Sequence, residues 1–372
     1  MDLSPQRTNM FAQLYAGKRV FITGHTGFKG SWLTAWLLRL GAEVAGFADC
    51  VPTEPANFDA LGLGGRIRDF RGDVRDRSTL QAALRDFAPD LVFHLAAQAL
   101  VRTSYQQPAD TFEVNAMGTL NVLESVRHTP SVQAVVCITS DKCYKNNEWL
   151  WGYREQDQLG GEDPYSASKG CAELIAQSYF QSFFAQGPAC ATTRAGNVVG
   201  GGDWARDRVV PDCARAWAAG QAVHIRSPQA TRPWQHVLEP LSGYLWLGAL
   251  LLEGRRELSG EAYNFGPAAE MNNTVAEVVE ALALHWPHFQ RKMEAGTAPG
   301  LKESTLLKLC CDKALTRLDW KAVLDFEECM RYTAEWYRAY YTQPRPDMLA
   351  LSMGQIAAYS VAAEARGLAW TR

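Results

Sequence analysis

Short apolar runs alternate with longer segments of helical periodicity through the first half of the chain, which is typical of βαβ units and a parallel sheet. Buried strands are predicted at residues 18–23, 43–47, 90–96 and 133–140. Helices are predicted at residues 30–40, 76–87 with Asp76 as the N-cap, 108–127 and 165–184. We therefore expect an α/β fold of the Rossmann type, with a doubly wound parallel sheet.

The pattern changes near residue 196, where predicted strands become short and Gly, Pro and Trp cluster in GNVVGGGDW and RPWQHV. Such irregularity favours a smaller α/β lobe that recognises a substrate. We expect a Rossmann domain over 18–195, with returning segments near 235–265 and 324–341, and a smaller lobe over 196–234 and 266–323. Residues 343–372 carry no motif, so we expect a C-terminal tail, part of it poorly ordered.

Length, composition and charge exclude several classes of protein. The 372 residues are 47% hydrophobic, which suffices for one large core, or for a large core and a smaller lobe. A net charge of −3 and a pI near 6.2 give no bulk attraction to nucleic acid or an anionic membrane. No run reaches about 18 apolar residues, and the charged first 19 residues lack the apolar core of a signal peptide. We therefore expect a soluble protein with neither of these partners.

The cysteines give no sign of a metal site. Nine occur without a CxxC pair or His-rich companion spacing, and the adjacent Cys310 and Cys311 suit neither a shared zinc site nor an easy mutual disulfide. We therefore expect no bound metal. Scattered thiols of this kind fit a reducing cytoplasm.

A glycine-rich turn at the first strand–helix junction predicts a dinucleotide site. Residues 23–30 read TGHTGFKG, in which Gly24 permits the tight turn, Gly27 lets the backbone approach a pyrophosphate, and Gly30 lets the helix pack on the strand. An ordinary strand–helix turn is the alternative, but the position within a βαβ series favours a cofactor. The cofactor-binding residues expected in this turn are Gly24, Thr26, Gly27, Phe28, Lys29 and Gly30.

Further positions predict how that cofactor lies and that it is NAD. Asp49, near the end of the second strand, is expected to bind the ribose hydroxyls; the alternative is that Ala48 occupies the usual position of that acid. No arginine follows immediately to hold a 2′-phosphate. Asp73 and Val74 lie either at the adenine edge or in a solvated loop. Ala96 and Ala97 close the fourth strand with small residues, where bulk would strike the cofactor.

The segment Tyr165-Ser-Ala-Ser-Lys169 is the strongest catalytic signal. Tyr165 and Lys169 lie four residues apart, on the same face of a predicted helix, where the ammonium would lower the pKa of the phenol. Ser140 ends a predicted strand at the carboxyl edge, where doubly wound sheets bind ligands. Alone, the Tyr–Lys pair would be a chance occurrence on an exposed helix. Together with the glycine turn and Ser140, it indicates acid–base catalysis.

These motifs resemble those of the extended short-chain dehydrogenase/reductase family. Within that family the chain most resembles the CDP-glucose 4,6-dehydratases, in a similarity that runs from about residue 18 to 341. The segments that carry it are SDKCY at 140–144, WGYRE at 151–155, GGEDPY at 160–165, RAGNVVGGGDW at 194–204 and RPWQHV at 232–237.

The resemblance assigns roles to Asp141 and Lys142. Related dehydratases usually have Thr-Asp-Glu in the place of Ser140-Asp141-Lys142, where the aspartate protonates the leaving C6 hydroxyl and the glutamate removes the C5 proton. By position Asp141 is the general acid; a local ion pair with Lys142 is the alternative. Because Lys142 replaces the glutamate, the C5 base stays open. It is a neutral Lys142, or else Tyr144 or a water, with Lys142 stabilising the enolate.

The implied reaction is an internal redox cycle on a nucleotide sugar, most closely CDP-glucose. Tyr165 takes the 4-hydroxyl proton as hydride passes from C4 to NAD, water leaves across C5–C6, and hydride returns to C6. The product is a 4-keto-6-deoxy sugar, and no external reductant is consumed.

A sugar diphosphate needs cations and amides, and arginine suits phosphate best. The resemblance assigns Arg208, Arg232 and Asn197 to the diphosphate or nucleotide, while each arginine is otherwise a solvated surface charge. Asn115 is expected to hold the active-site backbone together. The full set of expected substrate-binding residues is Gln98, Arg102, Ser104, Asn197, Arg208, Arg232 and His236, with Trp204, Trp234 and His236 either stacking on the base or belonging to the core.

The resemblance also implies a homodimer, formed through the helices at 108–127 and 165–184. Two rival functions keep the same fold. A nucleotide-sugar 4-epimerase or 4-reductase needs Tyr165 and Lys169 but no acid at position 141. A non-catalytic NAD-binding regulator typically loses the Tyr–Lys pair.

Overall fold

A seven-stranded parallel sheet forms the centre of the molecule. The computed structural model describes residues 10–223, 225, 227–286 and 307–372. The strands lie in the order β10-β6-β5-β4-β1-β2-β3, and the order reverses between β1 and β4. This is the doubly wound sheet that the sequence predicts, and ligands bind at the carboxyl ends beside such a reversal. The strands are β1 (Arg19–Thr23), β2 (Glu43–Ala48), β3 (Arg68–Arg71), β4 (Leu91–His94), β5 (Ala134–Ile138), β6 (Ala189–Arg194) and β10 (Ala262–Asn264).

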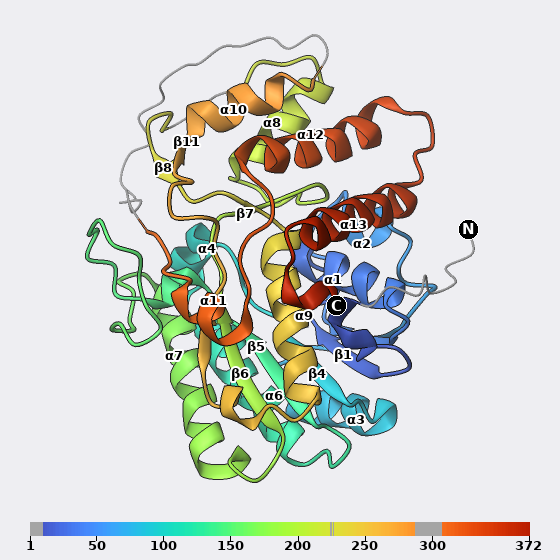
Figure 1. Ribbon diagram of the computed structural model, residues 1–372, viewed down its shortest axis with the longest axis vertical. Coiled ribbons are helices and arrows are strands. Elements are labelled where there is room, and N and C mark those ends of the chain that lie inside the picture. Colours follow the sequence, from blue (N-terminus) through green and yellow to red (C-terminus); the bar gives the residue numbers. More distant parts are fainter. Residues whose placement is uncertain (1–9, 224, 226, 287–306) are drawn as a thin grey trace.

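Helices cover both faces of the sheet because its side chains alternate between two cores. Phe21 packs with α3 (Arg77–Phe87), α6 (Gly118–Arg127) and α7 (Pro164–Tyr179) on one face. Val20 and Ile22 belong to the core on the other face, together with residues of α1 (Phe28–Arg39) and α9 (Leu238–Leu252). Figure 1 shows these two helices next to each other.

Local signals predicted the first-half helices well. Asp76 caps α3, because its carboxylate accepts hydrogen bonds from the backbone amides of Ser78 and Thr79 at 3.0 and 3.2 Å. The predicted helix at 108–127 is α5 (Pro108–Phe112), a π-helical turn (Glu113–Met117) and α6 in succession. The helix predicted at 165–184 is α7 followed by a second π-helical turn (Phe180–Phe184).

The second half is irregular, as expected. Its two-residue strands pair as β7 (Val198–Val199) with β9 (Gln235–His236), and as β8 (Thr231–Arg232) with β11 (Asn273–Thr274). The remaining helices are α2 (Asn57–Ala60), α4 (Val101–Gln106), α8 (Val209–Ala218), α10 (Val275–Ala283), α11 (Asp312–Leu318), α12 (Phe326–Thr342) and α13 (Met348–Ala365). The division into two lobes stays a prediction, and residues 287–306 of the smaller lobe lie outside the described residues.

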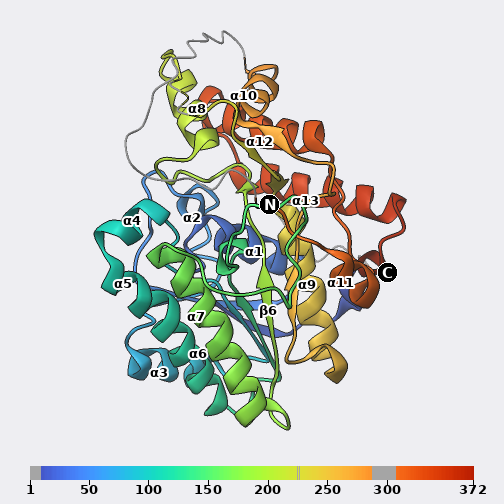
Figure 2. The same ribbon diagram turned by 90° about the vertical axis from the view of Figure 1, so that its left-hand side faces the viewer.

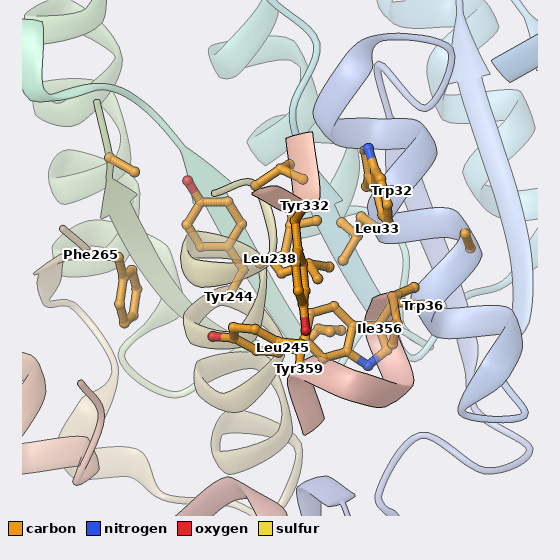
Figure 3. Close-up of a cluster of buried hydrophobic side chains, with 14 of the residues drawn as sticks. Trp32, Leu33, Trp36, Leu238, Tyr244, Leu245, Phe265, Tyr332, Ile356 and Tyr359 are labelled. Atoms are coloured by element: carbon orange, nitrogen blue, oxygen red, sulfur yellow. The ribbon is translucent and has the colours of Figure 1, made fainter. Parts of the chain in front are cut away.

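The expectation of a poorly ordered tail at 343–372 is wrong. Helix α13 packs on α1, and Ile356 and Tyr359 are fully buried there. Figure 3 shows their side chains beside Trp36 of α1 and Leu245 of α9. Trp370 continues this core, with its ring 5.2 Å from that of Phe11 and stacked on it. The C-terminal segment therefore completes the core on one face of the sheet.

Among the described helices, none combines the length and the apolar character required to cross a bilayer. Within the same residues, no group of three or more His, Cys, Asp or Glu side chains is arranged to hold a metal ion.

Candidate active site

The glycine turn has the geometry that a dinucleotide pyrophosphate requires. Gly24 has φ +74°, and a Cβ there would lie 2.7 Å from the Ala96 nitrogen; a Cβ on Gly30 would lie 2.2 Å from the Gly24 oxygen. By contrast, a Cβ on Gly27 would meet only the Gly24 oxygen, at 3.4 Å. Gly27 is the N-cap of α1 and no side chain caps that end, so the first amides of the helix are available to an anion.

The other residues expected at the cofactor surround this turn. Thr26 donates to the Cys50 carbonyl at 2.7 Å, which ties the turn to the chain just after β2, where the exposed Asp49 lies. Ala96 donates its amide to the Thr23 hydroxyl at 3.2 Å, and Ala97 follows it, half-buried. The position of Ala96 against Gly24 agrees with the need for small residues here.

Asp73 and Val74 lie in the loop between β3 and α3. Asp73 is paired with Arg75 through two guanidinium contacts of 2.7 and 2.9 Å, and these hydrogen bonds hold the pKa of its carboxyl below the ordinary value. Val74 is buried, and a Cβ on Gly118 would lie 2.8 Å from its side chain. This loop acid is therefore anchored locally to Arg75.

A hydroxyl and a carboxylate meet at the carboxyl end of β5. Ser140 donates to the Asp141 carboxylate at 2.9 Å and also caps the short 3₁₀ turn Asp141–Cys143 through the Lys142 amide. Asp141 is only 4% exposed. It forms part of the wall of a small cavity, together with Gly196, Pro233, Gln235, Gly266, Pro267 and Leu309.

Tyr165 and Lys169 lie in the first turns of α7, both buried. The Tyr165 phenol interacts with Ser140, which brings together the helix and the strand end. Burial raises the pKa of Tyr165 to about 12, and the interaction with Ser140 only partly offsets it. Burial lowers the pKa of Lys169 to about 8. The expected net lowering of the phenol pKa is therefore reversed, because desolvation outweighs the favourable neighbours.

Asn115 joins the loop after β4 to α7, as expected. Its side chain accepts from the Gln98 amide at 2.9 Å, donates to the Gln98 carbonyl at 3.1 Å, and donates to the Ser168 hydroxyl at 2.9 Å. Asn115 lies in the π-helical turn, a feature that recurs at functional sites. The half-buried Gln98 side chain bonds Leu100 in the loop and Thr111 of α5. Its expected contact with substrate stays a prediction.

Positive charge gathers beside the glycine turn. Burial and the nearby charge of Arg208 lower the pKa of Lys29 to about 8, and Lys169 contributes further repulsion. Arg208, at the N-terminus of α8, pairs with Asp203 at 2.7 Å and interacts with Tyr165. The charges of Lys169 and Arg208 thus act on Lys29, partly offset by Asp141 and Asp203, and cations in this region suit a ligand with phosphates.

The remaining polar residues expected at the substrate lie in exposed or half-buried positions. Arg102 of α4 forms an exposed ion pair with Asp207 at 3.0 Å. Asn197 has φ +50° and leaves its side chain half-buried at the end of β6. Arg232 of β8 donates to the Thr231 carbonyl at 2.8 Å. Their assignment to the nucleotide stays a prediction.

The structure corrects two expected substrate contacts and places the alternative base in a buried hydrogen-bond network. Ser104 and His236 are each 0% exposed, so neither side chain presents surface to a ligand. Ser104 donates within α4, and His236 packs edge-on against Trp32 and Tyr332. Tyr144 is 1% exposed, donates to Asn264 and accepts from Arg194. Burial raises the pKa of Tyr144 far above its ordinary value. Its role as the alternative C5 base stays a prediction.

The aromatic residues Trp204 and Trp234 also belong to the core. Trp204 lies among the rings of Trp336, Tyr337 and Tyr340, and Trp234 donates to the Asn273 carbonyl at 3.0 Å. The sequence left open whether these tryptophans stack on the base or belong to the core, and the structure supports the core.

Sequence reasoning missed three residues beside the catalytic group. Gly196 touches the Asp141 carboxylate, and Glu173 and Arg194 form a buried ion pair at 2.8 Å between α7 and β6. Glu173 carries a sequence signal, since it stands four residues after Lys169 and therefore on the same helix face. Gly196 and Arg194 are brought to the site only by the tertiary fold.

Comparison with known proteins identifies the family. Residues 21–333 match the family described as GDP-mannose 4,6 dehydratase. This chain belongs to that family. A CDP-glucose 4,6-dehydratase of Salmonella typhimurium is 45% identical over 351 residues, which cover 93% of this chain and 97% of the relative.

Solved structures agree on the fold. A UDP-glucose 4-epimerase of Thermus thermophilus in complex with NAD is 27% identical, with a TM-score of 0.72 over 86% of this chain and 99% of that one. A dTDP-glucose 4,6-dehydratase of Bacillus anthracis in complex with NAD is 21% identical, with a TM-score of 0.72 over 87% and 97%. The family fold therefore hosts both dehydratases and epimerases, and the site residues must decide between them.

Proposed function

We propose that this protein is an NAD-dependent CDP-glucose 4,6-dehydratase. The observation that supports dehydration most is the buried Asp141 carboxylate, 2.9 Å from the Ser140 hydroxyl, which in turn interacts with Tyr165. Elimination of water needs an acid beside the group that handles the 4-hydroxyl, whereas 4-epimerisation and 4-reduction do not. The 45% identity to a CDP-glucose 4,6-dehydratase supports CDP-glucose as the substrate.

Tyr165 and Ser140 handle the 4-hydroxyl of the sugar. Ser140 orients that oxygen, and Tyr165 takes its proton as C4 is oxidised. When bound, NAD would supply the hydride acceptor at C4 and the hydride donor at C6. Lys169 lies on the same helix face, and its pKa of about 8 is below that of Tyr165. Its amine can therefore gain and lose a proton near neutral pH.

Asp141 and Lys142 act at C5 and C6. Asp141 donates the proton with which the C6 hydroxyl leaves as water. Lys142 is half-buried on the same 3₁₀ turn and either removes the C5 proton in its neutral form or stabilises the enolate while a water removes it. The burial of Tyr144 supports restricting the choice to these two.

The proposed NAD site consists of the glycine turn and the neighbouring small and acidic residues. Asp49 binds the ribose hydroxyls, which favours NAD over NADP. The amides of Phe28, Lys29 and Gly30 face the pyrophosphate. Asp73, Val74, Ala96 and Ala97 complete the walls.

The proposed substrate site uses the cations of the second half. Arg208 and Arg232 bind the diphosphate, Asn197 donates to it, and Arg102 reaches the sugar after leaving Asp207. The grouping of Arg208 with Lys29 and Lys169 supports this placement, because a diphosphate offsets their mutual repulsion.

We also propose a cytoplasmic homodimer. Met117, Leu174 and Phe183 are 49%, 55% and 50% exposed on the segments around α6 and α7. Figure 2 shows these two helices side by side on the face turned to the viewer. Paired with its copy, this face would bury all three side chains. The nine free thiols support a reducing compartment.

A panel of nucleotide glucoses tests the function. The purified protein should convert CDP-glucose to a product lighter by one water, with the alkali-sensitive absorbance of a 4-keto-6-deoxy sugar and no net NADH. Tyr165→Phe should retain NAD and lose turnover. Formation of a 4-epimer would favour the epimerase reading, which the similarity to a UDP-glucose 4-epimerase supports, and the absence of any turnover would favour a regulator.

A further inference from the structure

A single buried carboxylate ties together three elements that meet beneath the catalytic group. Glu173 of α7 is 4% exposed. Its two oxygens accept from the Thr139 hydroxyl of the β5 end, from the Thr192 hydroxyl of β6 at 2.7 Å, and from Arg194 of β6 at 2.9 and 2.8 Å. This carboxylate is therefore fully engaged, with the two-pronged geometry of a strong arginine pair.

Arg194 extends the connection to the segment that follows the catalytic turn. Its remaining amino group donates to the Tyr144 hydroxyl at 2.7 Å and to the Glu155 carbonyl at 3.1 Å. The guanidinium also lies 4.8 Å from the centre of the Tyr144 ring. Tyr144 in turn donates to Asn264 of β10 at 2.8 Å. The pair thus holds the chain on the far side of Lys142.

The residues joined through Glu173 and Arg194 adjoin residues of the proposed mechanism at three points. Thr139 immediately precedes Ser140, and Lys169 stands one helical turn before Glu173 on the same face of α7. Tyr144 follows Lys142 by two residues. The segment that carries Ser140, Asp141 and Lys142 is therefore fixed at both ends to the helix that carries Tyr165 and Lys169.

The pair is ionised in this setting. Burial favours the neutral acid, but the charge and hydrogen bonds of Arg194 outweigh it and hold the pKa of Glu173 below its ordinary value. A buried ion pair is often no more stabilising than apolar residues of the same volume. A gain in stability is therefore a weak explanation for the Glu173–Arg194 pair. The fixed geometry that its hydrogen bonds impose is a better explanation.

We propose that the Glu173–Arg194 pair is a positioning device, which sets the distance between the Tyr165–Lys169 helix and the Ser140–Asp141–Lys142 turn. The proposal rests on the proposed dehydratase function. Neither residue touches the reacting sugar. The pair affects catalysis because the turn and helix α7 must act on the same sugar ring. The turn supplies the acid Asp141, and α7 supplies the phenol of Tyr165.

Two threonines allow a matched test. Thr139 and Thr192 are 7% and 6% exposed and donate to the same carboxylate. Arg194 ties β6 to Glu173 twice more, so loss of the Thr192 hydroxyl leaves β6 attached. Among the described contacts, Thr139, which directly follows β5, is the one side chain at this strand end that bonds Glu173, and its hydroxyl also donates to the Thr193 carbonyl at 3.2 Å. Thr139→Val therefore loosens the Ser140 end, whereas Thr192→Val makes an equal chemical change without doing so.

The kinetic constants, the retained NAD and the midpoint of thermal unfolding are measured for both variants with the nucleotide glucose that the wild type consumes. Thr139→Val should lower kcat at least about tenfold with KM and bound NAD unchanged, while Thr192→Val keeps kcat within about twofold. Tyr144→Phe, which frees the other end of the turn, should repeat the loss in kcat. Equal kcat values for the two threonine variants, or losses that track thermal stability alone, would overturn the positioning role. A wild type that consumes no nucleotide glucose would defeat the proposed function itself.

Discussion

Gly196 lies so close to Asp141 that a Cβ on the glycine would stand 1.9 Å from Oδ2 of the carboxylate. Asp141 is buried and held by Ser140, so it fills space that only a glycine leaves free. Gly196, two residues beyond β6, thereby limits the rotamers open to the proposed acid.

Gly196→Ala should therefore displace the Asp141 carboxylate and slow dehydration by about a hundredfold or more, since a shift near 1 Å has costs of this order. Gly354→Ala is the matched control, because a Cβ at Gly354 of α13 meets nothing within 4 Å. Steady-state rates of 4-keto-6-deoxy sugar formation measure both variants. Normal turnover in Gly196→Ala would show that the carboxylate has room to move without cost.

Asp141→Asn keeps the shape of the side chain and removes its proton donor. Oxidation at C4 should continue while loss of the C6 hydroxyl stalls, so reduced cofactor should accumulate on the enzyme. Single-turnover absorbance of NADH measures this directly. A 6-deoxy product formed at the wild-type rate would remove Asp141 from the mechanism.

Glu239 of α9 predicts a pH-dependent stability. Burial raises the pKa of its carboxyl to about 7, although the Val323 and Leu324 amides and the Tyr359 hydroxyl bond it. The folded state therefore binds an extra proton between the unfolded pKa near 4.5 and about 7. The contribution of this group to stability is present below that window and is lost as the pH rises through it, on the order of 3 kcal/mol in total.

Glu239→Gln should accordingly be destabilised most, relative to wild type, near pH 5, with the difference shrinking toward pH 7.5. Ser242→Ala, which removes a neighbouring hydroxyl that bonds Tyr359 and Trp320, should shift stability equally at each pH. Urea unfolding at a series of pH values compares them. Parallel profiles for the two variants would contradict the raised pKa.

Helix α13 should behave as core. Ile356→Ala should cost about 2–5 kcal/mol, as for other fully buried aliphatic side chains. Val361→Ala on the same helix, at a side chain 64% exposed, should cost less than about 0.5 kcal/mol. Equilibrium unfolding in urea measures both, and similar small losses would mean that the C-terminal helix is not part of the cooperative unit.

The parts predicted well from sequence rest on local signals. The glycine turn and the first strand were predicted together because turn chemistry and apolar periodicity agree over residues 18–40. Asp76 was found as a cap for the same reason. The short-range spacing of Tyr165 and Lys169 placed them correctly on one helix.

The parts that failed depend on tertiary packing. Helix α13 was missed because its buried positions, from Met348 to Ala363, form no motif. Ser104 and His236 were misplaced because nothing beside them in the sequence reveals that their side chains face the interior. The raised pKa of Tyr165 likewise depends on burial by distant elements, which spacing along a helix does not report.

The most direct test of the dehydratase assignment follows the hydride. CDP-glucose carrying deuterium at C4 is incubated with the protein, and the product is analysed by NMR and mass spectrometry. An internal redox cycle predicts deuterium at C6 of a 4-keto-6-deoxy sugar, transferred within one molecule. Deuterium retained at C4 of a sugar that keeps its C6 hydroxyl would contradict the account.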